Sequence, residues 1–466
     1  MRKTKLIPLL FTLKKAEWTK LQDFLASPYY NKDETVIQLF QQLATKIQRS
    51  DSDLDISKEE LAASLWPGKA YNAKEFTYVL SRLNKLVEQY IALEQINQSE
   101  FELQLAALDA FSERGLDKHF QASKRQLHKD LSNTKQSAFS VYKTRARLYE
   151  VEDLHYNRQR KRVYDPSIQL LGQHLDHAYF LQRLHQACSI LDRQHILQAD
   201  YDTAISEDWL RHISDNLADK EPIIQVYLDI FTMLQQENEV DHFATFKQHL
   251  FELQAVIADK DLTEIYFFAI NYCARKIRAG QEAYVAEALQ LYLQAIEAGW
   301  FIINEQLSPW TFANVVKLFL RQKEYDRAKT FIHKYISLLP AEFQENALHY
   351  NMAELHYYTN AYDEAQQHLV QVAFNDLNYY LGARVLLAKI YFQTGAEDAL
   401  SSLLAAFMMF LQRNKQLSKN LKSTYLNFCR ILARILRTTP EKRAAIRTKI
   451  EETSPLTDRV WLLSIL

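Results

Sequence analysis

Two histidines three positions apart, His174 and His177, are the strongest candidates for metal ligands in this sequence of 466 residues, and His185 follows them on the same predicted helix. An i, i+3 spacing places both imidazoles on one helical face. A structural zinc site, however, requires four protein ligands, and a catalytic site requires three and a water molecule. Because the chain holds fourteen histidines, such a pair arises easily by chance. We therefore predict neither a metal site nor a cofactor.

The cysteines and the short catalytic motifs give no sign of an enzyme. Cys188, Cys273 and Cys429 lie far apart, each within an apolar helical pattern. Their spacing excludes a CxxC motif and a disulfide framework, so we expect buried, unreactive thiols in a reducing compartment. The sequence also lacks the GxGxxG, GxxxxGK(S/T), HExxH and GxSxG motifs of nucleotide-binding proteins, zinc proteases and serine hydrolases. We predict that the protein is not an enzyme.

The strongest charge asymmetry lies at residues 412–449, where eleven lysines and arginines accompany a single acid, Glu441. Such a stretch could bind RNA or an acidic protein segment. Spread over two helices and a loop, the same residues also fit solvated helix surfaces. We favour this second interpretation because basic helical faces are common.

The elements that must position these residues are helices. The sequence has seven glycines and nine prolines, where average usage would give about thirty glycines. Sheet-rich folds use glycine in hairpins and nucleotide-binding folds use it in phosphate loops, whereas short connections between helices can do without it. The residues between apolar positions are mostly Gln, Glu, Lys, Arg, Ala and Leu, which favour helix. We predict an all-α fold.

Charge and hydropathy favour a cytoplasmic protein. The 56 Lys and Arg nearly balance the 57 Asp and Glu, so no overall field attracts nucleic acid or an anionic membrane. The apolar run Leu6–Phe11 starts like a signal peptide, but Lys14 and Lys15 interrupt it. No stretch approaches the roughly 20 apolar residues of a membrane-spanning helix, since even Leu403–Leu411 is followed by Arg413. We expect no membrane span.

Helical patterns and their breaks divide the chain into three predicted regions. Residues 1–97 form a helical domain, residues 98–200 form a connecting region of long helices, and residues 201–466 are periodic. Helices are predicted at Lys15–Ala26, Glu34–Ile47, Lys58–Leu65, Ala73–Glu94, Ser137–Arg162 and Ser167–Leu191.

The first domain suggests an alternative function in DNA binding. Lys58–Leu65, a Pro-Gly turn and the helix from Ala73 resemble the DNA-binding half of bacterial regulators that couple a winged helix-turn-helix to helical repeats. The β-hairpin wing of those regulators would follow Leu86, whereas here the helical pattern continues, and Glu88 and Glu94 would repel phosphate. The resemblance implies contacts in the major groove from Lys74, Thr77, Tyr78, Arg82 and Lys85.

The periodic region contains a repeated phrase. In residues 309–340, Phe312 and Val315 form an apolar stripe, Tyr325 follows a turn, Ala328 lies where two helices would cross closely, and Pro340 ends the unit. The phrase Tyr-Asp-x-Ala at 325–328 recurs at 362–365, 37 residues later. Small residues at the crossings, an aromatic near the turn and a closing proline resemble the tetratricopeptide repeat, a pair of antiparallel helices of about 34 residues.

Other copies of the phrase are weaker. A third places Ala399 34 residues after Ala365, although the tyrosine before it is missing. Ala288 and Ala244 occupy comparable positions upstream at longer intervals, so the register before about residue 300 is irregular. The apolar segment Leu456–Leu466 is expected to cap the array.

The resemblance implies an irregular α-solenoid in which the first helix of each hairpin lines an inner groove. We therefore expect a non-enzymatic scaffold or adaptor that binds a protein or peptide partner in this groove. The corresponding positions lack the full basic clamp of the repeats that bind chaperone tails. The groove residues implied by the resemblance are Asn314, Lys317, Arg321, Asn351 and Tyr358.

The chain as a whole resembles uncharacterised bacterial proteins of similar length. These share an early Phe-Leu-x-Ser-Pro-Tyr phrase, here residues 24–29, and a late Trp-Leu-Leu phrase, here residues 461–463. The likeness implies no particular activity. Because it involves both ends of the chain, it favours one integrated protein over a modular enzyme.

Overall fold

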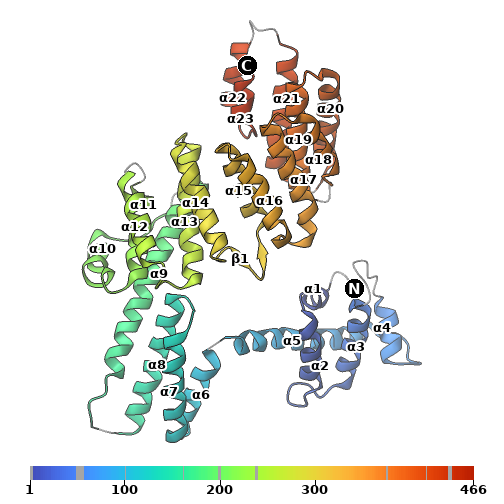
Figure 1. The fold of residues 1–466 in the computed structure, drawn as a ribbon. Helices are drawn as coiled ribbons and strands as arrows, with labels where there is room; N and C mark the ends of the chain where they lie inside the picture. Colours follow the sequence, from blue (N-terminus) through green and yellow to red (C-terminus); the bar gives the residue numbers. More distant parts are fainter. Residues whose placement is uncertain are drawn as a thin grey trace. The chain divides into compact units, whose positions relative to one another are not determined.

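The structure is almost entirely helical, which confirms the predicted all-α class (Figure 1). This computed structural model describes residues 4–48, 57–99, 101–160, 162–197, 201–236, 240–373, 376–415, 417–438 and 443–466. The chain divides into two compact units, residues 1–134 with 140–178 and residues 135–139 with 179–466. Within the described ranges, no helix combines the length and the apolar character that crossing a bilayer requires.

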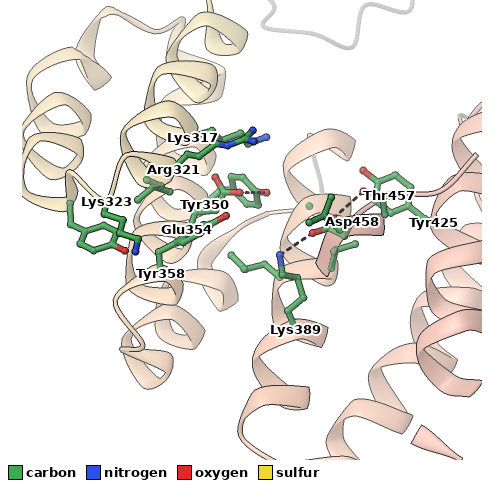
Figure 2. Close-up of a pocket in the computed structure, with 16 residues that line it drawn as sticks. Lys317, Arg321, Lys323, Tyr350, Glu354, Tyr358, Lys389, Tyr425, Thr457 and Asp458 are labelled. Atoms are coloured by element: carbon green, nitrogen blue, oxygen red, sulfur yellow. Dashed lines mark hydrogen bonds and ion pairs between the residues drawn. The ribbon is translucent and has the colours of Figure 1, made fainter. Parts of the chain in front are cut away.

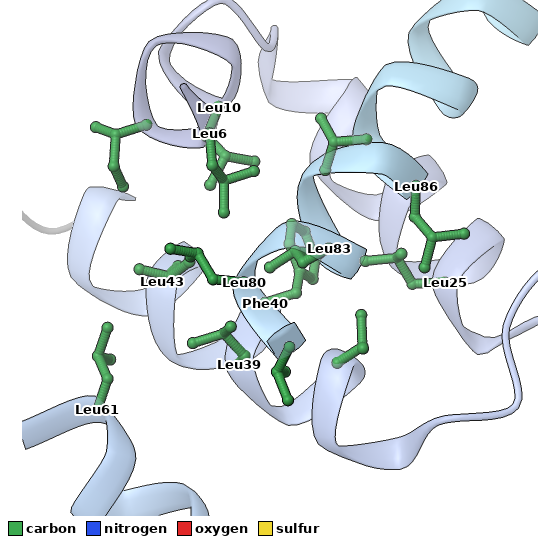
Figure 3. Close-up of a cluster of buried hydrophobic side chains, with 14 of the residues drawn as sticks. Leu6, Leu10, Leu25, Leu39, Phe40, Leu43, Leu61, Leu80, Leu83 and Leu86 are labelled. Atoms are coloured by element: carbon green, nitrogen blue, oxygen red, sulfur yellow. The ribbon is translucent and has the colours of Figure 1, made fainter. Parts of the chain in front are cut away.

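The first unit begins with five helices around one apolar core (Figure 3). They are α1 (Leu6–Phe11), α2 (Lys15–Ala26), α3 (Glu34–Gln48), α4 (Lys58–Leu65) and α5 (Ala73–Asn97). Their apolar residues recur at helical spacing, and Leu10, Leu39 and Leu83 are completely buried where the helices meet. The apolar run that resembled the start of a signal peptide is thus a core helix here.

Further helices of the first unit form a second core. They are α6 (Glu102–Glu113), α7 (Asp117–Asn133), the greater part of α8 (Ala138–Arg158) and the start of α9 (Ser167–Leu197). Phe120, Leu108 and Leu148 are buried together there. The long helices expected in residues 98–200 are therefore present, with ends that differ from the prediction by a few residues.

The second unit contains successive helical hairpins. Its first helices are α10 (Glu207–Ile213), the π-helix η1 (Ser214–Ala218), α11 (Pro222–Gln235), α12 (Val240–Leu253), α13 (Asp259–Arg278) and α14 (Ala283–Glu297). A short antiparallel pair, β1 (Ile302–Ile303) and β2 (Gln306–Leu307), precedes the next hairpin. The remaining helices are α15 (Pro309–Arg321), α16 (Tyr325–Tyr335), the 3-10 helix η2 (Ile336–Leu338), α17 (Ala341–Tyr358), α18 (Tyr362–Gln371), α19 (Leu377–Gln393), α20 (Glu397–Arg413), α21 (Lys419–Leu436), α22 (Arg443–Glu452) and α23 (Arg459–Ser464).

Consecutive hairpins stack on one another in this unit. Helix α15 packs against α16 and α17, α17 packs against α18 and α19, and α19 packs against α20. Each helix contributes an apolar stripe, such as Phe312, Val315 and Phe319 of α15, all of which are buried. A single hairpin of this size cannot bury such a stripe alone, so stacking stabilises the array.

Four described hairpins of the second unit close with the same turn. Gly280, Lys323, Asn360 and Gly395 each lie two residues beyond the end of a first helix and have positive φ angles of 89, 60, 59 and 70°. In each turn, the N–H of the following residue donates to the carbonyl five residues earlier, at 2.8–3.0 Å. This Schellman geometry favours glycine. A side chain in the left-handed region, as at Lys323, costs roughly 1–2 kcal/mol.

The helices that follow these turns show that part of the predicted repeat register was wrong. Ala328 and Ala365 are the fourth residues of α16 and α18 and are fully buried. In α20 the fourth residue is Leu400, which is also fully buried, whereas Ala399 is exposed. The equivalent position therefore lies one residue later than predicted, because a leucine replaces the small residue. Upstream, Ala244 is likewise exposed and cannot mark a close crossing.

Candidate functional site

A cavity of about 660 Å³ with a concentration of charge lies in the second unit. Side chains enter it from α15, α17, α19 and α21, and from the turn that precedes α23 (Figure 2). Three of these helices are the first helices of stacked hairpins, so their inner faces lie next to one another. Four cations and two carboxylates line this space.

Two of the four cations are engaged in ion pairs. Arg321 Nε donates to Glu282 Oε2 at 2.9 Å, and Arg321 Nη2 contacts the other carboxylate oxygen. Lys389 Nζ lies 2.9 Å from Asp458 Oδ1. Within the described residues, Lys317 and Lys323 have no hydrogen-bond or ion-pair partner, and both are exposed. The cavity therefore has a surplus of positive charge.

Lys389 is a half-buried cation with several stabilising contacts. Its Nζ lies 5.0 Å from the centroid of the Tyr357 ring and 5.6 Å from that of Trp461. Burial has the largest single effect and acts to lower the pKa of Lys389, but Asp458, Tyr357 and Tyr358 together raise the pKa above its ordinary value. This lysine is thus firmly protonated and belongs to an ion pair that connects α19 to the turn before α23.

Glu354 is the exceptional acid of the cavity. The Tyr350 hydroxyl donates to its Oε1 at 3.0 Å, while Oε2 is inaccessible to solvent and has no hydrogen-bond partner among the described residues. Burial raises the pKa of the Glu354 carboxyl, although Lys317, Tyr350 and Lys389 act in the opposite direction. A buried carboxylate oxygen without a partner is energetically costly, so Glu354 favours either a proton or a donor from a ligand.

A glycine allows Tyr350 to adopt this position. A Cβ at Gly382 of α19 would lie 2.8 Å from the Tyr350 hydroxyl and 2.9 Å from its Cε2. Such distances are shorter than van der Waals contact. The absence of a side chain at Gly382 therefore lets the Tyr350 ring pack against α19 and hold Glu354 at the cavity.

The predicted groove residues divide into two groups. Lys317, Arg321 and Tyr358 line the cavity together. Asn351 is completely buried, and its amide donates to the Ala347 carbonyl at 2.7 Å, so it is not available to a partner. Asn314 is exposed, but its amide donates to the Tyr292 hydroxyl at 3.2 Å and it does not line the cavity. The prediction for Asn351 placed it on the wrong side of α17.

Several cavity residues were missed. Tyr350 and Glu354 precede Tyr358 at intervals of four residues, so they share its helical face, and this spacing could have revealed them. Lys323 was hidden because a loop position carries no helical periodicity. Lys389 and Asp458 are 69 residues apart in the sequence, and nothing in their surroundings predicts that they form a pair.

The alternative DNA-binding residues form a stripe on α5. Lys74, Thr77, Tyr78 and Lys85 are exposed, whereas Arg82 is half-buried and its Nη1 lies 3.5 Å from Asp33 Oδ2. Helix α5 continues to Asn97 through the residues where a wing would begin. Three basic residues on α5 are balanced by three acids, Glu75, Glu88 and Glu94.

The basic stretch at 412–449 is only partly described. Its single acid, Glu441, and Lys442 lie outside the described residues. Arg430, Arg434 and Arg437 are exposed along α21 and its end. Among the described residues, none of these three arginines has an ion pair, so they form a solvated basic surface.

The histidines singled out by their spacing have packing roles. The His174 ring stacks on Tyr149 with centroids 5.4 Å apart, and the His177 ring meets Tyr142 edge-on. Burial lowers the pKa of His174 to about 4. His185 Nε2 lies 2.8 Å from Glu264 Oε2. Across the described parts of the chain, no three His, Cys, Asp or Glu residues are placed to hold a metal ion.

His185 and Glu264 border a second cavity of about 280 Å³, which also includes Tyr227 and Asp261. The hydrogen bond from His185 lowers the pKa of Glu264, and burial only partly opposes it. Asp261 Oδ2 accepts the Ala138 N–H at 2.8 Å. Both carboxylates thus have partners within the protein, as expected of a network that joins helices.

The three cysteines are buried, as predicted. Burial raises the pKa of Cys273 and Cys429 to about 12 and that of Cys188 well above its ordinary range. Thiols in such surroundings are poor nucleophiles.

Comparisons with protein families, with curated proteins and with solved structures yielded no match to this chain.

Proposed function

We propose that the protein is a non-enzymatic adaptor that holds a segment of a protein partner in the cavity of its stacked hairpins. The observation that carries this proposal is the convergence of Lys317, Arg321 and Tyr358 with the inner faces of α19 and α21 on one half-open cavity. Helical arrays present extended inner surfaces to partners in this way. The volume accommodates a few side chains of an extended chain.

The chemistry of the cavity fits binding better than catalysis. Its described lining contains no histidine, cysteine or serine, the residue types that most often act as a general base or a nucleophile near neutral pH. The tyrosines Tyr350, Tyr358 and Tyr425 instead offer flat surfaces with hydroxyl groups, which are typical of binding interfaces.

A second candidate function, DNA binding through α5, has one observation in its favour. Lys74, Thr77, Tyr78 and Lys85 are exposed in a single stripe that follows a helix and a turn. The balanced charge of α5 and the ion pair of Arg82 weaken this candidate, because phosphate contacts supply most of the affinity for DNA.

Affinity capture of the tagged full-length chain from its native cells, with and without nuclease, tests the proposal. The variant Lys317→Ala/Lys323→Ala removes the two unpaired cavity cations, and Lys118→Ala/Lys143→Ala removes two exposed lysines of the other unit as a control. We expect protein partners that survive nuclease treatment, are retained by the control and are lost from the cavity variant.

Two results would contradict the adaptor proposal. Equal recovery of partners by the cavity variant and the control would exclude the cavity as the binding surface. Loss of all partners on nuclease treatment would favour the second candidate function instead.

A further inference from the structure

We propose that the cavity binds a carboxylate side chain of an acidic partner segment, and that Glu354 takes up one proton from solvent when this segment binds. The inference rests on the proposed function and adds the chemistry of the partner and the pH dependence of its binding. Three observations support it: two lysines of the cavity without ion-pair partners among the described residues, a strained turn that contains one of them, and a carboxylate in the same lining with a buried, unpartnered oxygen.

The lysines define the charge of the ligand. Arg321 and Lys389 are occupied by Glu282 and Asp458, so Lys317 and Lys323 are the cations available to a ligand among the described lining residues. A cationic group would be repelled by Lys317 and Lys323. An acidic side chain would gain two charge-assisted contacts at the mouth of a partly enclosed space.

The turn at Lys323 indicates that this side chain has a use beyond closing the hairpin. Lys323 has φ 60°, in the left-handed region that glycine adopts without strain. The equivalent turns after α13 and α19 contain Gly280 and Gly395, and the turn after α17 contains Asn360, a residue type that visits this region more readily than lysine. A lysine in this position is less favourable for the fold than glycine, and strained residues concentrate at functional sites. Here the strained residue lines the cavity.

Glu354 links ligand binding to protonation. Lys317 favours the ionised form of Glu354 and works against burial, while Lys389 contributes less. An anion that occupies Lys317 adds negative charge close to Glu354 and offsets the effect of that lysine. The ionised carboxylate is then less favourable, and its Oε2 has no donor among the described residues. Protonation of Glu354 removes its negative charge, and this relieves both the repulsion by the bound anion and the cost of the oxygen without a donor.

The other titratable groups around Glu354 are expected to keep their protonation state when the ligand binds. Tyr350 and Tyr358 share its helix, and burial raises the pKa of both phenols, so they stay neutral. Asp458 faces the cavity from the turn before α23, but it is paired with Lys389. Arg321 of α15 is paired with Glu282, and the pKa of Tyr425 of α21 is raised by burial.

The test uses the full-length chain and a fluorescein-labelled peptide with four consecutive glutamates, compared with the same peptide carrying four glutamines. We expect the glutamate peptide to bind at least about tenfold more tightly, a difference in binding free energy that two charge-assisted contacts can supply. Its affinity should rise as pH falls, by at most about tenfold per pH unit for one proton. Calorimetry in two buffers of different ionisation enthalpy should show proton uptake.

Three variants separate the parts of the proposal. Glu354→Gln should retain binding of the glutamate peptide but lose its proton uptake, which also controls for nearby histidines. Lys317→Ala should weaken binding at least about tenfold. Lys323→Gly should weaken binding while raising the melting temperature, because glycine suits the turn.

Each failure has a distinct meaning. Equal binding of both peptides, or unchanged proton uptake in Glu354→Gln, would overturn this inference. If the captured cellular partner still depends on Lys317 and Lys323 in that case, the adaptor function stands and only the chemistry of its ligand is different.

Discussion

Two surfaces of this protein carry lysines that could contact a partner, and they are built differently. On α5, Lys74 and Lys85 lie in one stripe of one helix, and the opposite side of that helix is buried in a core. In the cavity, cations come from α15, from the turn after it and from α19. A stripe on one helix can be read from spacing, whereas a site assembled from stacked helices cannot.

The two regions also differ in the kind of residue that they bury. The inner face of α5 is apolar, with Leu83 and Val87 completely buried, so it serves stability alone. The cavity face of α17 contains Tyr350 and Glu354, whose burial is costly unless their contacts are satisfied. In the cavity, therefore, residues available for binding reduce the stability of the fold.

The largest expected change in the free energy of unfolding comes from the apolar inner face of α5. Leu83→Ala removes a fully buried side chain from the first core (Figure 3) and should lower the free energy of unfolding of its unit by about 2–5 kcal/mol. Lys85→Ala, two residues along the same helix but exposed, should change it by less than about 0.5 kcal/mol. Urea denaturation followed by circular dichroism measures both. Similar losses would show that α5 is not anchored as described.

A smaller effect is expected where α19 meets the cavity. Gly382→Ala places a Cβ within 3 Å of the Tyr350 ring, so the ring must move and its hydrogen bond to Glu354 must break or lengthen. Overpacking of this kind costs about 1–3 kcal/mol, and binding at the cavity should weaken as well. Thermal denaturation and peptide binding provide the two measurements.

Gly172→Ala is the matched control for that prediction. Gly172 also lies within a helix, but apart from its chain neighbours and the backbone of its own helix, no described atom would lie within 4 Å of its new Cβ. Alanine should therefore stabilise the helix by about 0.5–1 kcal/mol through its higher helix propensity. Stabilisation by both substitutions would mean that Tyr350 does not occupy the position described.

The sequence-based predictions were more accurate where local interactions decide the structure than where the packing of distant segments decides it. The starts of α4 and α5 were predicted correctly because their capping residues, Ser57 and Asn72, act locally. The register of α20 was wrong by one residue, since the crossing position there holds Leu400 and not a small residue. Local signals set helix ends, while the packing partner decides which side chain fits a crossing.

The lining of the cavity also depends on contacts between segments that are distant in the sequence. Of the groove residues implied by the repeat resemblance, Lys317, Arg321 and Tyr358 line the cavity, whereas Asn351 faces the interior. The partners Glu282 and Asp458, which leave only two lysines free in the described lining, come from distant segments. Charge balance in a site depends on such pairs, so it could not be predicted from one helix.

A pH effect on stability is expected in the hairpin beside the cavity, as it is for the first unit, where the pKa of His174 is also lowered. His349 Nδ1 of α17 and His368 Nδ1 of α18 are 3.0 Å apart, an arrangement that allows a proton on only one of the two atoms. Burial, His349 and His356 lower the pKa of His368 below its unfolded value. The unfolded chain therefore binds protons first on acidification, and stability should fall from about pH 7 to about pH 5.

The slope cannot exceed about 1.4 kcal/mol per pH unit for each proton. His368→Asn removes the titrating group, and the melting temperature of the second unit should then depend less on pH. His333→Asn, an exposed residue of α16, is the control and should leave the slope unchanged. Burial lowers the pKa of His356 as well, so part of the slope should remain in His368→Asn. An unchanged slope in that variant would contradict the proposed proton sharing.

The smallest effect is expected from the lysines of α5. At about 150 mM salt, a labelled DNA duplex of about 20 base pairs should show no binding, because the three cations of α5 face three acids on the same helix. Lys74→Ala/Lys85→Ala should then behave like Lys118→Ala/Lys143→Ala in fluorescence anisotropy, even at lower salt. Binding that falls steeply with salt and is lost only in the α5 variant would reverse the comparison, since one stripe would then suffice for function. In that case the exposed Tyr78 and Thr77 become the residues to test for base contacts, because lysine contacts to phosphate give affinity but little sequence specificity.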